Sequence, residues 1–450
     1  MTLIIVAILL LGYLLIATES LTNINKAAVA IFVGTVGWVL YICYGADFVM
    51  NQHAADYSRF LDGAISTSNT VKGYIAQNIF MKYVGKASEI VFFLLATMWI
   101  VEILNNNGCF DFIAQILKTR KSRKMLWILS IVTFLISANL DNLTTTVMML
   151  TIMHGIIPNR RHRMYYGAAI VLAANCGGLL TVIGDSTGLV LWNMGAVSAT
   201  DYSMHLVLPC LIAWILPTWW IGRSLPERVD AEWVTMPYRG DDTRLNVWQR
   251  AFMLIVGIGG LWFIPTFHNI TKLSPFLGAL CVLSILWIVN EVVNRKLMRV
   301  DDTIRSRIPR VLQYGGIQMM LFVMGMMLAV GVVQETGAIQ WLWALICQNG
   351  FDNVWLVGCV AGAVSSVLDS FTTAISFISL HSDAGHNDTY WHVIAYCTAM
   401  GGNVLSIGSV SGLALMKAEH MHGAWYFRNI GWKSLVANVI GLAVLFAVEY

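Results

Sequence analysis

The stretch SANLDNLTTT, at residues 137–146, returns in the second half of the chain as SSVLDSFTTA, at residues 365–374. Five of the ten positions are identical at an offset of 228 residues. A second pair follows in the same order, GGLLTVIGDSTGL from Gly177 and GGNVLSIGSVSGL from Gly401, with six of thirteen positions identical at an offset of 224. Small-residue patterns recur by chance in membrane helices, but two matched pairs in one order at nearly one offset indicate an internal duplication.

The sequence around these motifs is that of a membrane protein. The chain has 450 residues, of which 57% are hydrophobic and 12% are charged, against roughly 25% charged residues in an average soluble domain. Apolar runs recur along its whole length and approach the length needed to cross about 30 Å of hydrocarbon. Examples are residues 27–44, 87–104, 202–221, 251–267 and 435–448. No stretch is left for a soluble catalytic domain, and the net charge of +3 gives no reason to expect nucleic acid as a partner.

Several features are expected to be structural rather than functional. The opening MTLIIVAILLLGYLLIA lacks the basic region and the cleavage pattern of a signal peptide, so we interpret it as the first span. The eight cysteines never form a CxxC pair, which predicts neither disulfides nor a metal site. Histidines in loops or at span ends are expected on the solvated surface: His381, His386, His392, His420 and His422.

Basic residues indicate the topology, because short loops rich in Lys and Arg stay on the cytoplasmic side. Basic clusters flank the apolar stretch 125–157 on both sides. That stretch must therefore return to its starting side, which predicts a re-entrant hairpin with its tip at residues 137–142. The stretch 353–380 has the same form, but no Lys or Arg occurs between Arg310 and Lys417. This second hairpin is expected to open to the outside.

The complete prediction is an all-α membrane protein with two inverted repeats, about ten transmembrane helices and two re-entrant hairpins, with two of the helices broken. Both termini are expected outside a bacterial inner membrane, and short segments at 109–117 and 338–347 are expected to lie at its interface. The chain divides into N-terminal helices with an external loop (1–86), a first inverted repeat (87–221), a linker with two helices and cytoplasmic loops (222–310), and a second inverted repeat (311–450).

The ionisable residues expected deep in the membrane are few and acidic. Such groups cost roughly 2.5 to 3.5 kcal/mol on insertion and usually mark an ion or proton path. Asp141 and Asp369 occupy equivalent places at the two hairpin tips, and Asp185 lies in TVIGDSTG, within a helix expected over residues 165–197. No Lys or Arg nearby in the sequence offers these aspartates a partner. The helices of the second motif pair are expected to break at glycines: Gly184 and Gly188, then Gly408 and Gly412.

The residues around the aspartates supply further oxygen ligands, and broken helices add unwound carbonyls. Such a set suits a hard cation such as Na⁺ or Li⁺ and not a soft metal, so no metal is expected beyond the transported ion. The candidates are Asn139, Asn142, Thr144, Thr145, Asn175, Ser186, Thr187, Ser370, Thr372, Thr373, Ser409 and Ser411. Any single Ser or Thr could instead bond back to its own helix, and Asn175 could bridge two helices. Glu102, nearer a span end, is a candidate for a proton path or an interfacial residue.

At these residues the sequence resembles the NhaD-type sodium/proton antiporters of the ion transporter superfamily, which also contains dicarboxylate and arsenite carriers. The resemblance covers nearly the whole chain and rests on SANLDNLTTT, AANCGGLLTVIGDSTG, SSVLDSFTTA and GGNVLSIGSVSG. It implies exchange of cytoplasmic sodium or lithium for external protons, an elevator-like movement of the hairpin domain, and a homodimer. Ser409 stands where the first repeat has Asp185, so the two halves of the site are not expected to be equivalent.

The expected mechanism is competition, in which a carboxylate holds either a proton or a sodium ion. A sodium-coupled carrier of a dicarboxylate or another anion is the alternative. Uncompensated carboxylates would repel an anion, and no intramembrane Arg or Lys is expected to attract it, although helix N-termini could. An intramembrane aspartyl protease also needs two buried aspartates, but its GxGD signature fails because Val182 stands where the first glycine should be. We therefore expect a secondary transporter without a cofactor or enzymatic activity.

Overall fold

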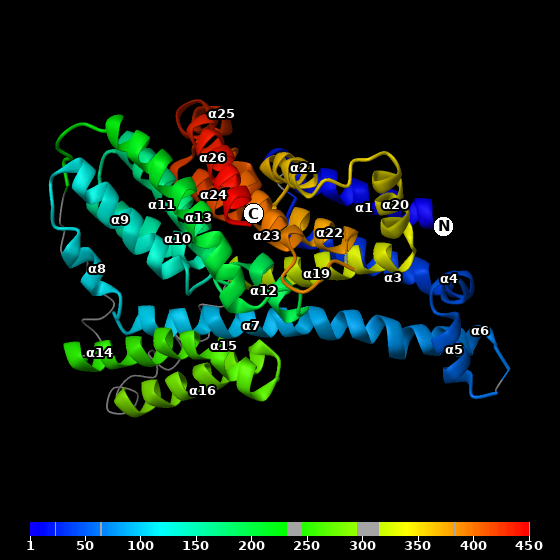
Figure 1. Ribbon diagram of the computed structural model, residues 1–450. Coiled ribbons are helices and arrows are strands. Elements are labelled where there is room, and N and C mark those ends of the chain that lie inside the picture. The colour runs from blue at the N-terminus through cyan, green and yellow to red at the C-terminus, as the bar shows by residue number, and fades with distance from the viewer. Residues whose placement is uncertain (23, 64, 232–244, 295–314, 382, 450) are drawn as a thin grey trace.

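The computed structural model describes the chain except for residues 23, 64, 232–244, 295–314, 382 and 450 (Figure 1). Within the described residues the chain forms helices and no strand, apart from one isolated bridge between Lys121 and Arg228. The all-α prediction is therefore confirmed. The expected cytoplasmic loops of the linker fall largely on residues 232–244 and 295–314, outside the described part of the chain.

Seven helical stretches among the described residues are long and apolar enough to cross a membrane. They are Lys26–Cys43, Ser68–Asn106, Ala199–Arg223, Val247–Thr271, Pro275–Val293, Gly316–Glu335 and Gly423–Glu449. Shorter apolar helices include the N-terminal one, Thr2–Ala17. These helices agree with a membrane protein, while the count of ten spans stays a prediction.

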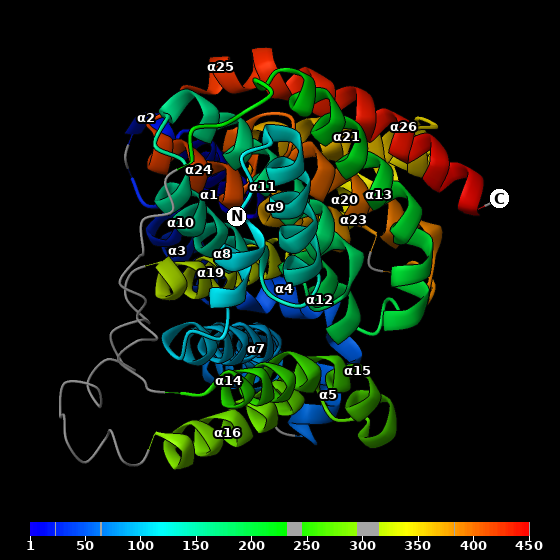
Figure 2. The same cartoon turned by 90° about the vertical axis from the view of Figure 1, so that its left-hand side faces the viewer.

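One group of helices, which we call the frame, comes from residues 2–106 and 247–335. It is built around two helices in contact, α3 and α19, and the long α7, which packs against α19 and α16 (Figures 1 and 2). Asn25 caps α3, its side chain accepting a hydrogen bond from the Ala27 amide at 2.8 Å. The N-terminal elements are α1 (Thr2–Ala17), α2 (Glu19–Thr22), α3 (Lys26–Cys43), α4 (Gly45–Gln52), α5 (Ala54–Leu61), α6 (Ser68–Tyr74), the π-helical η1 (Ile75–Phe80) and α7 (Met81–Asn106). The continuous helix through α6 and α7 crosses the expected domain boundary at residue 86.

The later frame helices lie along α7, as both views show (Figures 1 and 2). Asn107 donates to Asn290 at 2.7 Å and accepts from Asn294 at 2.9 Å, so buried amides join the end of α7 to α16. The helices are α14 (Val247–Leu254), the π-helical η3 (Ile255–Gly259), α15 (Gly260–Thr271), α16 (Pro275–Val293) and α19 (Gly315–Glu335).

A second group, which we call the hairpin body, comes from residues 122–223 and 354–449, and the short helices α8 (Asp111–Ile116) and α20 (Ala338–Gln348) connect the frame to it. Its first half contains the expected first hairpin, α9 (Ser122–Ser137) and α10 (Asn142–Ile156), preceded by the short α8 (Asp111–Ile116). The chain continues through α11 (Arg160–Leu180), α12 (Ser186–Asn193) and α13 (Ala199–Arg223). The helix break between α11 and α12 includes Gly184 as predicted. The prediction for Gly188 is wrong, since that glycine lies inside α12, where its bare Cα lets the backbone of Val182 approach closely.

The second half has the same order of elements. After α20 (Ala338–Gln348), the expected second hairpin is formed by α21 (Val354–Val367) and α22 (Ser370–Leu380). A broken helix follows, made of α23 (Thr389–Gly401), the 3₁₀ turn η5 (Ser406–Gly408) and α24 (Val410–Glu419). The break includes Gly408 as predicted, whereas Gly412 lies inside α24, contrary to the prediction. The chain ends with α25 (Gly423–Tyr426), the π-helical η6 (Phe427–Gly431) and α26 (Trp432–Glu449).

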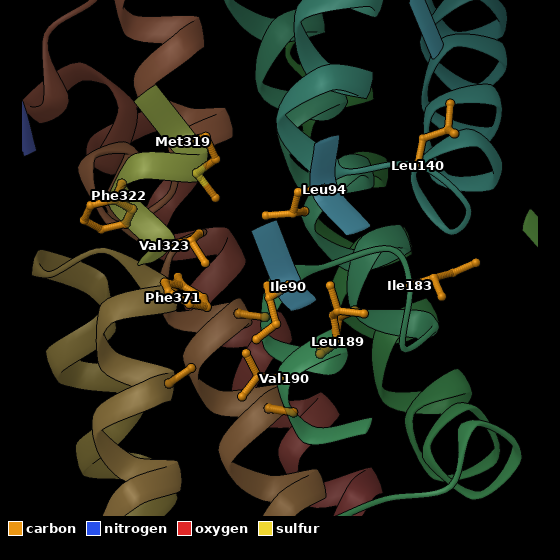
Figure 3. Packing of buried hydrophobic residues seen from close by; sticks show 14 of the residues in the cluster. Ile90, Leu94, Leu140, Ile183, Leu189, Val190, Met319, Phe322, Val323 and Phe371 are labelled. Atoms are coloured by element: carbon orange, nitrogen blue, oxygen red, sulfur yellow. The ribbon is translucent and has the colours of Figure 1, made fainter. Parts of the chain in front are cut away.

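Apolar side chains fill the boundary between the frame and the hairpin body. Figure 3 shows Ile90 and Leu94 of α7 between Val323 of α19 on one side and Leu189 and Val190 of α12 on the other, and all five are buried. Dispersion and hydrophobic contacts of this kind carry no directional preference. The packing therefore holds the two groups together without fixing them by hydrogen bonds at these positions.

Candidate functional site

The first hairpin tip presents a buried carboxylate at the start of a helix. Asp141 caps α10, and its Oδ2 accepts hydrogen bonds from the Thr144 amide at 3.1 Å and from the Thr144 hydroxyl at 3.3 Å. The residue is 4% exposed, and its Oδ1 has no hydrogen-bond partner among the described residues. The helix dipole favours a negative charge at this position. One carboxylate oxygen is thus fixed, while the other remains available to a ligand.

The break in the first broken helix brings a second carboxylate to this tip. Asp185 precedes α12, and Asn142, which follows Asp141, donates its Nδ2 to Asp185 Oδ1 at 3.3 Å. Asn142 thus places the second carboxylate beside the first hairpin tip. The close fit requires glycine, because a Cβ at Gly184 would lie 2.7 Å from the Ser137 carbonyl oxygen in the hairpin. Asp141, Asn142 and Asp185, expected as ligands, therefore lie together.

The second hairpin tip carries its carboxylate in the same way, but this carboxylate is paired. Asp369 caps α22, and its Oδ1 accepts from the Phe371 and Thr372 amides at 3.1 and 3.4 Å. Its Oδ2 lies 2.6 Å from Nζ of Lys26, in the first turn of α3. The side chains of Lys26 and Asp369 are 12% and 4% exposed. The sequence near Asp369 offers no Lys or Arg, and the fold supplies one from the N-terminal part of the chain.

Sequence distance explains why this partner was missed. Lys26 is 343 residues away from Asp369 and stands directly before the apolar run of α3, where a lysine is expected to mark a solvated flank. In the structure its ammonium lies 4.3 Å from the centre of the Phe322 ring of α19. A cation over an aromatic face is electrostatically attracted to it. The lysine therefore connects the frame to the tip of the second hairpin.

The two halves of the site differ in charge, as the substitution at Ser409 predicted. Ser409 caps α24, and its hydroxyl oxygen accepts from the Gly412 amide at 3.0 Å. The first half thus holds two carboxylates, Asp141 and Asp185. The second half holds one carboxylate, neutralised by an ammonium. The negative charge of the site is concentrated in the first half.

Some of the expected ligands make hydrogen bonds within the protein instead. Asn175 donates to Asn403 Oδ1 at 2.7 Å, which is the bridging role considered as the alternative, although its own Oδ1 has no partner among the described residues. Asn139 donates to the Leu135 carbonyl at 2.8 Å, and the Thr373 hydroxyl donates to the Asp369 carbonyl at 3.1 Å.

Other buried hydroxyls have no hydrogen-bond partner among the described residues. Buried polar groups are normally satisfied, so each such oxygen requires an explanation. Three were expected as ligands: Thr145, Thr372 and Ser411. Two neighbours were not singled out from the sequence, Thr146 and Ser406, although both lie within the repeated motifs.

The remaining expected residues occupy different environments. Ser186 and Thr187 are 2% exposed in the first turn of α12, and Ser370 is half-buried at the start of α22. Glu102 is half-buried in α7, so it belongs to the frame and not to the hairpin body. The surface prediction for His392 is wrong, because α23 is packed on several sides and the histidine has no exposed surface.

A comparison with known proteins agrees with this architecture. The family model described as "Citrate transporter" matches residues 3–401. The chain belongs to this family. It is 30% identical to "Sodium/proton antiporter 1" of Arabidopsis thaliana over 367 residues, which are 81% of this chain and 62% of that relative. It is 28% identical to "Sodium/proton antiporter 2" of the same plant, over 98% of both chains. It is also 24% identical to "Na(+)/H(+) antiporter NhaD" of Vibrio parahaemolyticus, over 78% of this chain and 87% of that relative.

These relatives confirm the resemblance to NhaD-type antiporters within the ion transporter superfamily. The family and these relatives are transporters by name and not enzymes. The family match covers both hairpins and the first broken helix, which contain Asp141, Asp185 and Asp369. The three aspartates therefore lie within the matched part of the chain, whereas Ser409 and Ser411 lie beyond it.

Proposed function

We propose that this chain is a secondary antiporter that exchanges cytoplasmic Na⁺, or Li⁺, for external H⁺ at its intramembrane carboxylates. One observation carries the proposal: Asp141 presents a buried carboxylate oxygen without a hydrogen-bond partner among the described residues, next to a second carboxylate, Asp185. Burying negative charge in this way is costly unless a cation or a proton compensates it. Carboxylate, amide and hydroxyl oxygens are hard ligands, as an alkali cation prefers.

The electrostatics support competition between the two ions. In the first half of the site, two neighbouring carboxylates attract either one sodium ion or a proton. In the second half, Lys26 already compensates Asp369. We propose that sodium and protons compete mainly at Asp141 and Asp185, and that the second half joins the cycle only when Lys26 leaves Asp369. The Phe371 and Thr372 amides would still hold the Asp369 carboxylate in place, so that it could bind a sodium ion.

Matched contacts in the two halves support an inverted repeat of elevator type. Ser137 donates to the Ala174 carbonyl at 2.7 Å, and Ser365 donates to the Thr398 carbonyl at 2.5 Å, at the offsets of the repeated motifs. Each contact joins a hairpin tip to the broken helix of its own half. We propose that the hairpin body moves as a unit against the frame, in a homodimer embedded in the inner membrane with both termini outside.

The family description gives the alternative function its strongest support. A family described as "Citrate transporter" matches most of the chain, so a sodium-coupled carrier of a di- or tricarboxylate must be considered. Lys26 supplies the basic group that such a carrier needs, but Asp369 occupies it. The first half of the site, with its two carboxylates, would repel the anion. These charges favour cation exchange.

Everted membrane vesicles distinguish the two functions. With a respiration-driven proton gradient, adding Na⁺ should dissipate the gradient in vesicles that contain the protein and leave it unchanged in vesicles that lack it. Radiolabelled citrate with a sodium gradient should not accumulate in proteoliposomes of the purified protein. Accumulation of citrate without sodium-dependent proton movement would establish the carrier and reject the antiporter.

A further inference from the structure

A compact cluster of titratable residues lies away from the hairpin tips, where three helices of the hairpin body end. Asp201 and His205 are one turn apart near the start of α13, His392 lies near the start of α23, and Glu449 ends α26. Figure 1 shows the C-terminal end of the chain beside α23, in agreement with the contacts between α23 and α26. The expected transport residues are in other segments, so this cluster has no part in the proposed exchange.

Glu449 orients the buried histidine of this cluster. His392 Nδ1 lies 2.8 Å from Glu449 Oε1, and the Thr389 hydroxyl donates to Glu449 Oε2 at 2.7 Å. A carboxylate that accepts the Nδ1 proton fixes the neutral imidazole in one tautomer, with the lone pair on Nε2. Metal-binding histidines commonly have such a carboxylate behind them.

The other nitrogen of His392 faces a second carboxylate without a good hydrogen bond. His392 Nε2 is 3.2 Å from Asp201 Oδ2, yet neither atom makes a hydrogen bond to any described residue. Both atoms are buried, and His392 has no exposed surface. With the proton on Nδ1, a lone pair of Nε2 would face a carboxylate oxygen, which is unfavourable unless a cation lies between them.

His205 completes a set of three ligands around this gap. Its ring stacks on that of His392, with centres 4.6 Å apart and planes 13° apart. Its Nδ1 lies 3.0 Å from the Asp201 carbonyl and can donate to it, which leaves the Nε2 lone pair for another partner. Ligand atoms of Asp201, His205 and His392 lie within 4.8 Å of one another.

We propose that Asp201, His205 and His392 form a binding site for a divalent transition metal ion, with Zn²⁺ the best fit, and that Glu449 positions His392 in it. Two imidazoles and one carboxylate are typical zinc ligands, and a fourth position would be left for water. Asp201 and His205 are 27% and 28% exposed, which gives an ion a way in. The bound ion would link α13 to α23 directly and to α26 through Glu449, and so stabilise the hairpin body.

The test uses purified full-length protein in detergent, stripped with chelator and titrated with Zn²⁺ or with Co²⁺ as a spectroscopic probe. We expect one Zn²⁺ per chain, a higher melting temperature with Zn²⁺ than with Mg²⁺, and Co²⁺ absorption bands typical of tetrahedral coordination. His392→Gln and Asp201→Asn should abolish the Co²⁺ bands, and Glu449→Gln should weaken binding by about 10- to 100-fold. The matched control is His422→Gln, an exposed histidine at the start of α25, which should bind normally.

Two outcomes would overturn the proposal. The first is wild-type protein that shows neither the Co²⁺ bands nor stabilisation by Zn²⁺. The close contacts of His392 with Asp201 and Glu449 would then be explained by a protonated histidine paired with both carboxylates. The second is Zn²⁺ binding that survives in Asp201→Asn, His205→Gln and His392→Gln alike, which would put the ion elsewhere. His205→Gln keeps the test decisive if the buried His392 variant fails to fold, since His205 is partly exposed.

Discussion

At the scale of single residues, the most consequential feature is that the three aspartates differ in how their charge is compensated; Asp141 and Asp369 are buried and Asp185 is half-buried. Asp369 has an ammonium at 2.6 Å, whereas among the described residues Asp141 and Asp185 accept hydrogen bonds from Thr144 and Asn142 and have no ion pair. A buried charge without a counter-ion is stabilised only by binding a cation or a proton. This difference supports the proposal that sodium and protons compete mainly in the first half of the site.

Neutralising the aspartates should stop exchange. In Asp141→Asn and Asp185→Asn, the amide keeps the size and hydrogen bonding of the carboxylate but can neither take up a proton nor attract Na⁺. Sodium-dependent proton movement in everted vesicles should fall to the background level of vesicles without the protein. Asp369→Asn should do the same, while Glu102→Gln, in the frame helix α7, should be milder. Normal exchange in all three Asn variants would remove the case for carboxylate-mediated antiport.

The Lys26–Asp369 pair should behave as a coupled unit. Lys26→Gln leaves Asp369 buried without its counter-ion, and breaking a buried ion pair from one side costs about 3–5 kcal/mol. We expect a clear drop in the melting temperature of the purified protein for Lys26→Gln and for Asp369→Asn. The double variant should recover much of that loss, because no unpaired charge remains. If the two losses simply add, the pair does not contribute to stability in the membrane protein.

Sequence reasoning found the carboxylates but not their surroundings. Asp141 and Asp369 stand in repeated motifs, so the sequence alone predicted their equivalent positions, and both cap the second helix of a hairpin. Their depth in the membrane stays a prediction. His392 was expected on the solvated surface, and Lys26 was not singled out because it stands directly before an apolar run, where a basic residue is usually solvated. Both are held by carboxylates far away in the sequence, Asp369 and Glu449, and no local pattern encodes such long-range contacts.

At the scale of elements, each broken helix is packed against its hairpin through glycines. A Cβ at Gly177 of α11 would collide with the Phe134 carbonyl of α9, and one at Gly401 of α23 would collide with the Gly362 carbonyl of α21. These contacts are equivalent in the two halves. The hairpin tips were predictable from their polar residues. The role of a glycine such as Gly188 was not, because a glycine can either break a helix or allow another segment to pack closely against it.

Adding one methyl group at these contacts should destabilise the protein and reduce exchange. Gly177→Ala and Gly401→Ala each force a backbone shift between two packed helices, and overpacking of this kind costs about 1–3 kcal/mol. We expect lower melting temperatures and reduced exchange for both variants. Gly85→Ala is the matched control, because a Cβ at that position would have no described atom within 4 Å and alanine favours a helix more than glycine. Equal effects at Gly85 and Gly177 would contradict the packing argument.

At the scale of the whole molecule, the proposed orientation can be read from two reporter fusions. A fusion at Gly240, in the arginine-rich linker that lies outside the described residues, should report the cytoplasm, since basic loops remain inside. A fusion at Asp383, beyond the second hairpin, should report the outside. If both fusions report the same side, the inverted orientation of the two repeats is wrong.

The proposed elevator movement requires the hairpin body to slide along the frame. Many contacts at the boundary are apolar and would permit this (Figure 3), while polar contacts such as Lys26–Asp369 and Glu89–Asn193 would have to break. Phe322 of the frame helix α19 meets Phe371 of the second hairpin there, with ring centres 6.3 Å apart. In a variant without the native cysteines, Phe322→Cys with Phe371→Cys, joined by a reducible cross-linker, should stop exchange, and reductant should restore it.

The matched control for this cross-link lies inside the hairpin body. Phe134 of α9 and Trp214 of α13 stack with ring centres 4.5 Å apart, and both helices belong to the group that should move together. Joining Phe134→Cys to Trp214→Cys should therefore leave exchange largely intact, because no relative movement is needed between them. Full exchange by protein cross-linked between residues 322 and 371 would show that the hairpin body transports ions without moving past the frame, and would reject the elevator.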